Sequence, residues 1–440
     1  MTKDVRWLAG LPAPQARYWF GEKESPGSPD AMDSFTFRIT GPVDEAALRG
    51  ALRTVIGRHT ALRTLITRQS HRLLTTVVEP DAVGEVLEVR HAAPPEHEEA
   101  LRAFAHRPFH LDRDLPVRAL LVACGTTDDG PSHLVVCVHH VAFDGWSATL
   151  FFSQLGAAYR ALRHGELPPG DPPSHYERIW RAQSEAETER DRSDLMEWAQ
   201  DLVGVPDLPL PLSPVPDSPG ALGEQLVVLS PRHTGLLEVA ARNAATTPNA
   251  LLLTAWVRAL RALTGGRDFA VGLPVSGRTS LASMTAIGCF VSVVPLRFRA
   301  PGHVEGDVER DVERDVERDL GQTVAGLAKA LRFQFSPLES IVGEAVAHDA
   351  HRTPLCQAAF VSQEQTDLTL RLDGAESVYV PRLKPESAFE VTLEVWFATR
   401  TTARIKHRVD VLDQRRAARL AGLWRAEVDT VVKVCADSPR

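Results

Sequence analysis

Two adjacent histidines, His139 and His140, lie in the segment of this chain that most directly suggests chemistry. They end an apolar run, and Asp144 and Gly145 follow closely after them. Imidazole is the side chain whose unperturbed pKa lies nearest neutrality, and a general base held in place contributes roughly 10²–10⁴-fold to a reaction rate. The segment therefore predicts a site at which one imidazole accepts or positions a proton.

The element that carries these histidines decides which way each of them points. Residues 134–140 form an apolar run that predicts a buried strand, and successive side chains of a strand point to opposite faces. His139 then shares a face with Cys137, whereas His140 shares one with Val138. We expect one histidine to face a reaction channel and the other to be buried and hydrogen-bonded.

The flanking sequence predicts a mixture of helices and strands in both halves of the chain. A helix should follow Asp144 and continue to about Leu162. Six prolines between 205 and 219 predict a semi-rigid spacer, and the mixed pattern resumes after it. The other expected helices are 43–56, 174–202, 236–245, 251–263 and 414–432; the other expected strands are 117–124, 269–275, 291–298, 357–362, 391–397 and 403–411.

One low-complexity insert interrupts this pattern. Residues 307–318 repeat the sequence Asp-Val-Glu-Arg three times. A period of four places the valines on one slowly drifting stripe of a helix, and charged neighbours on such a helix pair only weakly, at about 0.2–0.5 kcal/mol each. We expect a lengthened, solvated helix; a surface that docks a partner is the alternative.

Composition excludes several classes of protein. The chain has 440 residues, 44% of them hydrophobic and 24% charged, which are ordinary globular values for two domains. A net charge of −8 offers no basic surface for nucleic acid, and no apolar stretch is long enough to span a membrane. The five cysteines are scattered, and the N-terminus lacks the apolar core of a signal peptide. We expect a cytoplasmic monomer.

The pattern His-His-x-x-x-Asp-Gly at 139–145 resembles the signature of the condensation domains of nonribosomal peptide synthetases. These domains belong to the acyltransferases that resemble chloramphenicol acetyltransferase. Other segments resemble family motifs in the same order, and they lie at 11–20, 58–64, 268–278, 287–292 and 352–363. The chain departs from the family pattern at Pro14, at Ser292 in place of asparagine, and at Phe333 and Phe335.

The resemblance implies an α/β (α+β) fold with two acetyltransferase-like lobes, each a mixed sheet with flanking helices. It implies a V shape with a tunnel between the lobes. We expect an N-terminal lobe at 1–180, a helix and proline-rich linker at 181–222, and a C-terminal lobe at 223–440. A start at Met1 and a charged C-terminal end favour a free-standing enzyme over an excised domain.

The resemblance also implies the substrates. No cofactor is expected to bind directly, because both substrates are presented on phosphopantetheine arms. The partners are carrier proteins for the donor and for the acceptor, or a free small molecule as acceptor. The product is an amide; the alternatives are an ester formed on a hydroxyl acceptor, or a catalytically silent domain that recruits a carrier protein.

The resemblance assigns roles to the motif residues. His140 takes the proton of the attacking amine or positions the nucleophile, and both roles need a largely neutral imidazole. Asp144 is expected to pair with Arg63, so that its loss would harm folding as much as chemistry; the rival role is a catalytic acid. Gly145 either donates its backbone N–H to the thioester oxygen or serves a turn that requires glycine. With His139, these residues form the expected site.

Three further residues are candidates for supporting or lining the site. Trp146 and Ser147 open the helix after the motif, and we expect Ser147 to cap it. Ser147 is also a candidate for the substrate channel. Ser292 either lines the channel from the second lobe or is a tolerated polar residue at a strand end.

Other chemistries fit the sequence less well. A metal site made from Cys137, His139, His140 and Asp144 is disfavoured because strand parity splits these side chains between two faces. The chain has no His-Glu-x-x-His motif and no Gly-x-Ser-x-Gly motif, so neither a metalloprotease nor a serine hydrolase is indicated. Within the family, an epimerase would need a glutamate from the second lobe that no segment clearly supplies, and a heterocyclase would carry aspartates in place of the histidines.

Overall fold

The computed structural model describes residues 11–12, 14–16, 18–19, 31–69, 72–92, 94–123, 130–170, 173–188, 192–210, 221–300, 312–335, 355–363, 368–381, 389–397 and 400–437. The chain divides into two compact units. Unit 1 comprises Met1–Arg190, Ser276–Val291 and Asp367–Lys384, and unit 2 comprises Asp191–Val275, Ser292–Thr366 and Pro385–Arg440. The sequence led us to expect two continuous lobes, whereas two segments of the second half belong to unit 1.

Unit 1 is built on a five-stranded mixed sheet and a separate two-stranded hairpin. The sheet has the strand order β11-β1-β6-β5-β4, in which only β4 and β5 run parallel, and β2 pairs with β3. The strands of unit 1 are β1 (Met32–Thr40), β2 (Thr64–Gln69), β3 (Arg72–Val77), β4 (Leu87–His91), β5 (Val117–Ala123), β6 (Ser132–His139) and β11 (Glu376–Val380). Its helices are α2 (Glu45–Arg58), η3 (Thr60–Arg63), η4 (Pro80–Ala82), α3 (Pro94–Ala105), η5 (His140–Ala142), α4 (Gly145–Arg163), α5 (Tyr176–Thr188) and α9 (Leu281–Met284).

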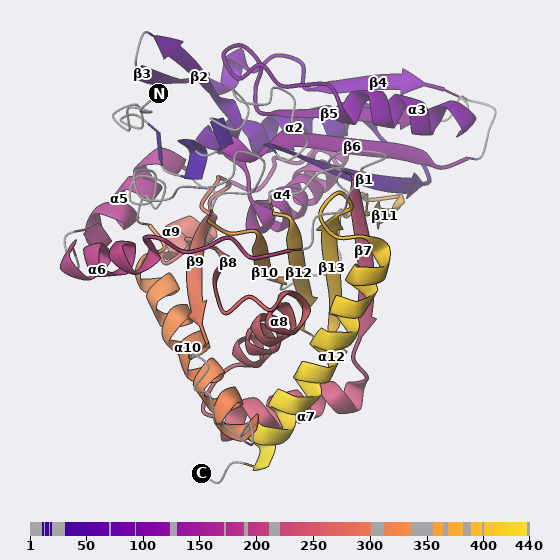
Figure 1. Cartoon of the computed structure of the whole chain (residues 1–440). Coiled ribbons are helices and arrows are strands. Elements are labelled where there is room, and N and C mark those ends of the chain that lie inside the picture. The colour runs from indigo at the N-terminus through magenta and orange to yellow at the C-terminus, as the bar shows by residue number, and fades with distance from the viewer. Residues whose placement is uncertain are drawn as a thin grey trace. The chain divides into compact units, whose positions relative to one another are not determined.

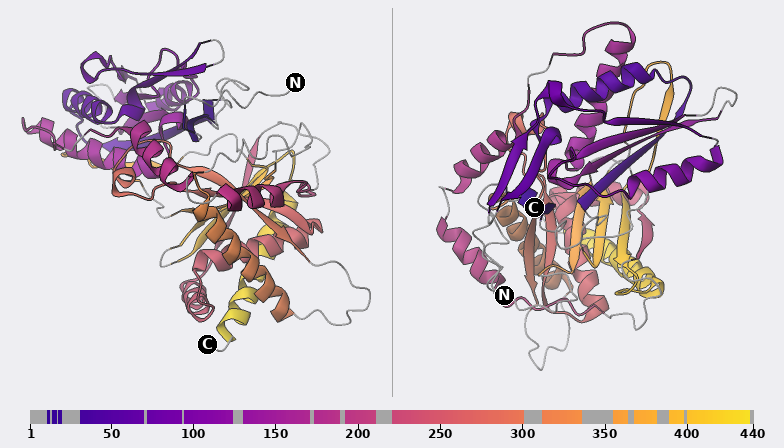
Figure 2. Two further views of the ribbon diagram at one scale, coloured as in Figure 1. Left: turned by 90° about the vertical axis from the view of Figure 1, so that its left-hand side faces the viewer. Right: turned by 90° about the horizontal axis from the view of Figure 1, so that it is seen from above.

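Alternation along the strands gives unit 1 a core on each face of its sheet. Val136 and Val138 of β6 pack with α2 and α4, whereas Val135 and Cys137 pack on the other face with Phe104 of α3. The helices on the two faces can be followed in Figure 2. Because β6 is buried on both faces, its sequence is almost continuously apolar.

Local sequence explains where α2 begins and which face it buries. The Asp44 side chain accepts a hydrogen bond from Ala47 N at 2.9 Å, which caps the helix. Leu48, Leu52 and Ile56 are fully buried, as their helical spacing predicts. The expected helix at 43–56 is therefore confirmed, with its start moved to Glu45.

Unit 2 is built on a six-stranded mixed sheet. Its strand order is β7-β13-β12-β10-β8-β9, and β10 runs parallel to both of its neighbours. The strands are β7 (Leu222–Val228), β8 (Asp268–Val275), β9 (Ser292–Arg299), β10 (Ala358–Gln363), β12 (Val391–Trp396) and β13 (Thr402–Arg408). The helices are α6 (Arg192–Leu202), α7 (Pro231–Asn243), α8 (Pro248–Thr264), α10 (Val312–Arg332) and α12 (Gln414–Asp437). Figure 1 shows α8 and α12 side by side across the sheet, and both contribute to the core of this unit, with Trp256 and Trp424 fully buried.

The low-complexity repeat leads into α10, which begins at Val312; residues 307–311 lie outside the described residues. Val316 is fully buried, although we expected a solvated helix, and one side of α10 therefore packs in the core of unit 2. Asp319 directly follows the repeat and is 2% exposed, with Arg258 at 3.1 Å and Arg261 at 2.7 Å. The extended helix is confirmed for the described residues, but its valine stripe belongs partly to the core.

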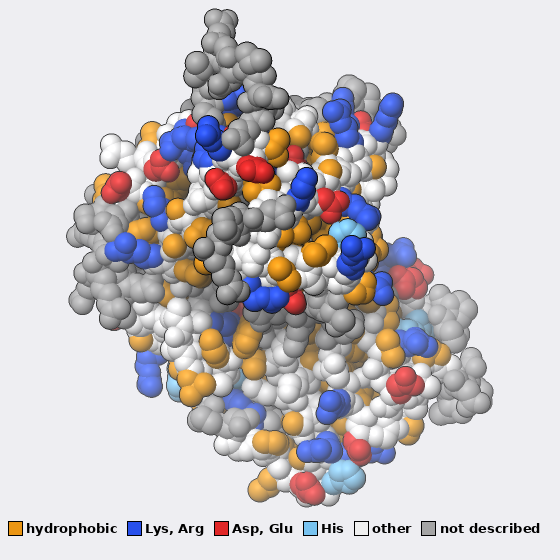
Figure 3. Space-filling view, turned by 90° about the horizontal axis from the view of Figure 1, so that it is seen from below, with side chains coloured by type: hydrophobic (Ala, Val, Ile, Leu, Met, Phe, Trp, Pro, Cys, Tyr) orange, Lys and Arg blue, Asp and Glu red, His pale blue; other side chains and the backbone are white. Residues whose placement is uncertain are grey.

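The described surface carries charges of both signs. On the face shown in Figure 3, basic and acidic side chains are interspersed. Each helix of the described residues is too short or too polar to traverse a lipid bilayer.

Candidate active site

The histidine pair lies at the junction between β6 and the following turn. β6 ends at His139, one residue earlier than expected, and His140 begins η5. His139 is fully buried, accepts a hydrogen bond from Val141 N at 3.1 Å and meets the Phe109 ring edge-on at 6.0 Å. His140 keeps 13% of its side chain exposed. The two histidines therefore differ in environment, as expected, but strand parity is not the reason, because His140 lies in η5 beyond the end of the strand.

The His140 ring has a partner at each nitrogen and an aromatic ring against its face. Nδ1 lies 3.3 Å from the Phe143 carbonyl oxygen, and Nε2 lies 3.1 Å from Asp33 Oδ2. The Tyr18 ring stacks on the imidazole with a centroid distance of 4.8 Å and an interplanar angle of 20°. Gln15 lies in the same N-terminal segment and donates to Val141 O at 2.7 Å, which ties that segment to the turn.

Asp144 organises the turn that follows the histidines. It is 3% exposed and is the N-cap of α4, because its Oδ1 accepts from Ser147 N at 2.8 Å. The same oxygen accepts from the Ser147 hydroxyl at 2.8 Å, and Oδ2 accepts from Phe290 N at 3.0 Å. A carboxylate at a helix N-terminus is also stabilised by the helix dipole.

The cation that pairs with Asp144 is Arg278, not Arg63. The Arg278 guanidinium is buried and lies 2.8 Å from Asp144 Oδ1 and 3.0 Å from Oδ2. Arg63 is also buried, but it donates to the carbonyls of Gly57 and Val78. The expected Asp144–Arg63 pair is therefore wrong: Arg63 neutralises the carbonyl end of α2, and burial lowers its pKa, with Glu79 opposing that shift.

Arg278 also holds its own segment, residues 276–291, in place within unit 1. It donates to Ala286 O at 2.7 Å and to Ser283 O, and its guanidinium lies over the Phe290 ring at 4.3 Å. His59 accepts from Ile287 N at 3.3 Å and meets Gln154 Oε1 at 2.8 Å. Two motif segments that the sequence assigned to different lobes thus meet in one unit.

Close packing against Tyr176 secures the same segment. The Tyr176 hydroxyl donates to Cys289 O, and a Cβ added to Gly288 would lie 2.1 Å from the Tyr176 ring. Only glycine fits this approach. Burial raises the pKa of Tyr176 well above its ordinary value, so this phenol stays neutral and structural.

The structure revises the roles expected for Ser147 and Gly145. Ser147 is fully buried, so it does not line a channel, and Asp144 rather than Ser147 caps α4. Its hydroxyl accepts from Gly288 N at 3.1 Å. Gly145 is exposed, has no left-handed φ, and a Cβ on it would meet nothing within 4 Å. The turn therefore does not require a glycine at position 145. There is open space beside the Gly145 backbone.

Trp146 and Ser292 occupy edges of their elements. Trp146 is 41% exposed and donates from Nε1 to Met284 O at 2.9 Å, so it supports the segment 276–291. Ser292 is the first residue of β9 in unit 2 and is partly exposed. Its place in a substrate channel remains a prediction.

Near the motif we also considered a cysteine nucleophile and a metal site. Burial raises the pKa of the Cys137 thiol to about 12, so it is not a thiolate near neutral pH. Within the described part of the chain, no three His, Cys, Asp or Glu side chains converge as a metal site would require.

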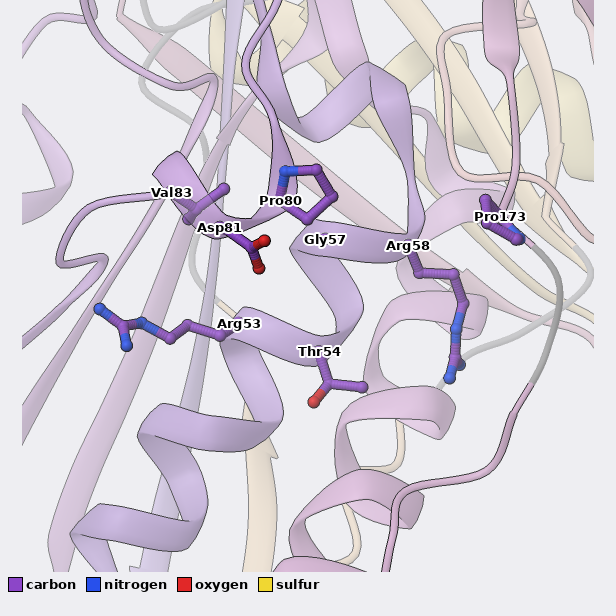
Figure 4. A pocket seen from close by; sticks show the side chains of 8 residues that line it. All are labelled: Arg53, Thr54, Gly57, Arg58, Pro80, Asp81, Val83 and Pro173. Atoms are coloured by element: carbon purple, nitrogen blue, oxygen red, sulfur yellow. The ribbon is translucent and has the colours of Figure 1, made fainter.

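A polar hollow also opens on unit 1. It has a volume of about 510 Å³ and is lined mainly by the last turns of α2 and by η4, including Arg53, Arg58 and Asp81 (Figure 4). None of the residues of the histidine motif lines it. Arg58 is engaged there by Pro169 O and, at 3.5 Å, by Gln154 Oε1.

Comparison with known proteins identifies the class to which this fold and site belong. A family model for the condensation domain matches residues 9–438, and the chain belongs to this family. It is 30% identical, over 97% of its length, to the probable non-canonical nonribosomal peptide synthetase CymA of Salinispora arenicola, and 28% identical, over 95%, to the phosphinothricin tripeptide synthetase PhsB of Streptomyces viridochromogenes. The chain spans only 5% and 35% of these relatives.

Solved structures support the fold. The X-domain from teicoplanin biosynthesis superposes with a TM-score of 0.80 at 23% identity, covering 98% of this chain and 96% of that one. The same domain in complex with OxyB gives a TM-score of 0.79, covering 100% and 95% of the two chains. The expected fold of mixed sheets flanked by helices in two lobes is thereby confirmed.

The site contains residues that the sequence argument missed. Gln15 and Tyr18 lie in the 11–20 motif and Arg278 lies in the 268–278 motif, so the family resemblance pointed to their segments without assigning them roles. Asp33 lies in none of the matched segments. The sequence analysis predicted no element around residue 33, so β1 was also missed, and a single aspartate there carries no signal that would have marked it.

Proposed function

We propose that this condensation-family chain transfers an acyl or aminoacyl group from a carrier-protein thioester to an amine and so forms an amide. The amine nitrogen attacks the thioester carbonyl carbon, the C–N bond forms and the C–S bond breaks. The proton that the nitrogen loses passes by way of His140 to the departing thiolate, so that the carrier arm leaves as a thiol. Carrier proteins for donor and acceptor are the proposed partners.

The observation that supports this proposal is the contrast between the two histidines. His139 is fully buried and hydrogen-bonded, whereas the side chain of His140 is 13% exposed. His140 lies on a short turn that is followed by Asp144, the buried N-cap of α4. A base held on a rigid element and still open to substrate fits general-base or positioning chemistry. Gly145 N–H, at the start of α4, is the proposed donor to the thioester oxygen.

A second candidate is a domain that recruits a partner without catalysis. The neighbour that supports it is the X-domain of teicoplanin biosynthesis, whose complex with OxyB superposes at a TM-score of 0.79. The intact His-His-x-x-x-Asp-Gly pattern favours the enzyme over this alternative.

One experiment separates these functions. The protein is incubated with an acyl-loaded carrier protein and a panel of amines and alcohols, and the products are identified by mass spectrometry. An amide supports the proposal, an ester supports the hydroxyl-acceptor alternative, and no transfer to any acceptor supports the recruiting domain. His140→Ala should slow transfer by roughly 10²–10⁴-fold, whereas the matched control His164→Ala, at a histidine 56% exposed, should leave it unchanged.

A further inference from the structure

The pairing of His140 with Asp33 is the feature of the site that its motif does not explain. Asp33 is the second residue of β1 and lies opposite Val138 in the β1–β6 register. Because alternate residues share a face, Asp33 lies on the same face of β1 as Phe35 and Phe37, which form the core. Asp33 continues this apolar row with a carboxylate at the end of the strand, where β6 gives way to the turn.

The contacts of the imidazole fit a particular charge state. Phe143 O lies at Nδ1 and Asp33 Oδ2 lies at Nε2, and both are acceptors. A neutral imidazole has one N–H and one lone pair, so either tautomer would place a lone pair against an oxygen. The imidazolium donates at both nitrogens and satisfies both contacts.

The two acceptors differ in how readily they can leave. The Phe143 carbonyl is a backbone group that lies between the η5 turn, which Phe143 N closes by donating to His140 O at 3.2 Å, and Asp144, the N-cap of α4. The Asp33 carboxylate is on a side chain that is 16% exposed. From the N-terminal segment, the Tyr18 ring covers the imidazole face, and an aromatic face attracts a cation.

We propose that Asp33 is a positioning residue that holds His140 as an imidazolium and fixes its plane before substrate enters. The ring becomes a base when it releases one proton to solvent, and Nε2 becomes available when the Asp33 carboxylate moves aside. Among the described residues, the groups that contact the ring include Asp33 from β1, Tyr18 from the N-terminal segment and the Phe143 carbonyl from its own turn. The catalytic meaning of this inference rests on the proposed function, but the charge state of the ring does not.

The test is an NMR titration of the histidine rings in the ¹⁵N-labelled protein without substrate. The His140 signal is assigned by its loss in His140→Gln. Asp33→Asn removes the charge with little change of shape, so the midpoint of the His140 titration should fall by roughly one to two pH units. Asp33→Glu should restore most of the shift, and the exposed Asp112→Asn should leave the midpoint unchanged.

Turnover then distinguishes this inference from the proposed function. If a neutral His140 is needed, the acid limb of the kcat profile should move to lower pH in Asp33→Asn by the same amount as the NMR midpoint. A midpoint that moves while no variant forms product sustains the role of Asp33 and overturns the proposed function. Product formation with an unmoved midpoint in a folded Asp33→Asn overturns the role of Asp33.

Discussion

Two carboxylates contact the turn at 139–145, and they serve it differently. Asp144 is 3% exposed and accepts from Arg278, Ser147 and the Phe290 backbone. Asp33 is 16% exposed, and its Oδ2 lies 3.1 Å from His140 Nε2. Deep burial with several donors suits a carboxylate that holds structure, whereas partial exposure beside an imidazole suits one that adjusts chemistry. Type of residue alone does not separate the two roles.

The largest effect should follow removal of the Asp144–Arg278 pair. Asp144→Ala leaves the buried Arg278 charge without its carboxylate, so we expect a loss of about 3–5 kcal/mol in the free energy of unfolding. Denaturant titration measures it. The double variant Asp144→Ala/Arg278→Ala should lose less than the sum of the single variants.

The rival role of Asp144 as a catalytic acid makes the opposite prediction. It would be supported if Asp144→Ala kept the wild-type melting temperature and lost all turnover. Asp144→Asn is a useful companion because it keeps an oxygen for the α4 cap while removing the charge that faces Arg278.

The two histidines should affect different properties of the protein: His140 mainly turnover, and His139 mainly stability. His140→Ala should lower kcat by roughly 10²–10⁴-fold. Its loss of stability should be smaller than that of His139→Ala, because the His140 side chain keeps 13% of its surface exposed whereas His139 is fully buried. His139→Ala removes a fully buried ring, so we expect a loss of about 2–4 kcal/mol in stability. Unfolding curves and single-turnover rates of both variants test this split, and equal stability losses would contradict it.

Gly145→Ala probes whether substrate uses the open space beside the backbone. A Cβ meets nothing within 4 Å and the residue begins a helix, so stability should stay the same or rise by up to about 1 kcal/mol. Turnover should nevertheless fall if the thioester approaches the Gly145 N–H. Unchanged kcat and KM would show that the methyl group and the substrate do not compete.

Trp146→Phe should give the smallest effect. It removes the hydrogen bond to Met284 O from a side chain that is 41% exposed, so the expected loss is below about 1 kcal/mol. Thermal unfolding measures it, with Asp112→Asn as the matched surface control. A loss comparable to that of Asp144→Ala would mean that Trp146, and not Arg278, anchors the segment 276–291.

Local patterns predicted the elements around the site well. The helical spacing of Leu48, Leu52 and Ile56 predicted the buried face of α2. The two histidines differ in environment as expected, although His140 lies in η5 and not on the strand to which the parity argument applied. The cap of α4 was misassigned, because both Asp144 and Ser147 are good capping residues and the backbone geometry chooses between them.

Such local patterns could not predict which residues pair when they lie far apart in the sequence. The family resemblance implied Arg63 as the partner of Asp144, although Arg278 also lies in a matched motif. The actual partner, Arg278, lies 134 residues away in a segment that crosses into unit 1. Asp33 meets His140 because β1 pairs with β6 in one particular register.

By itself, the sequence determined the short-range features of this protein: a buried strand that leads into two adjacent histidines, a helix that starts directly after an aspartate, and membership of a family whose motifs occur in order. Hydrophobic period and capping chemistry act over a few residues, so they can be inferred from neighbours along the chain. Tertiary structure decided which arginine neutralises Asp144 and which carboxylate meets His140. Such pairs form only when strand register and a returning segment bring distant side chains together, and burial then makes each of these charges depend on its partner.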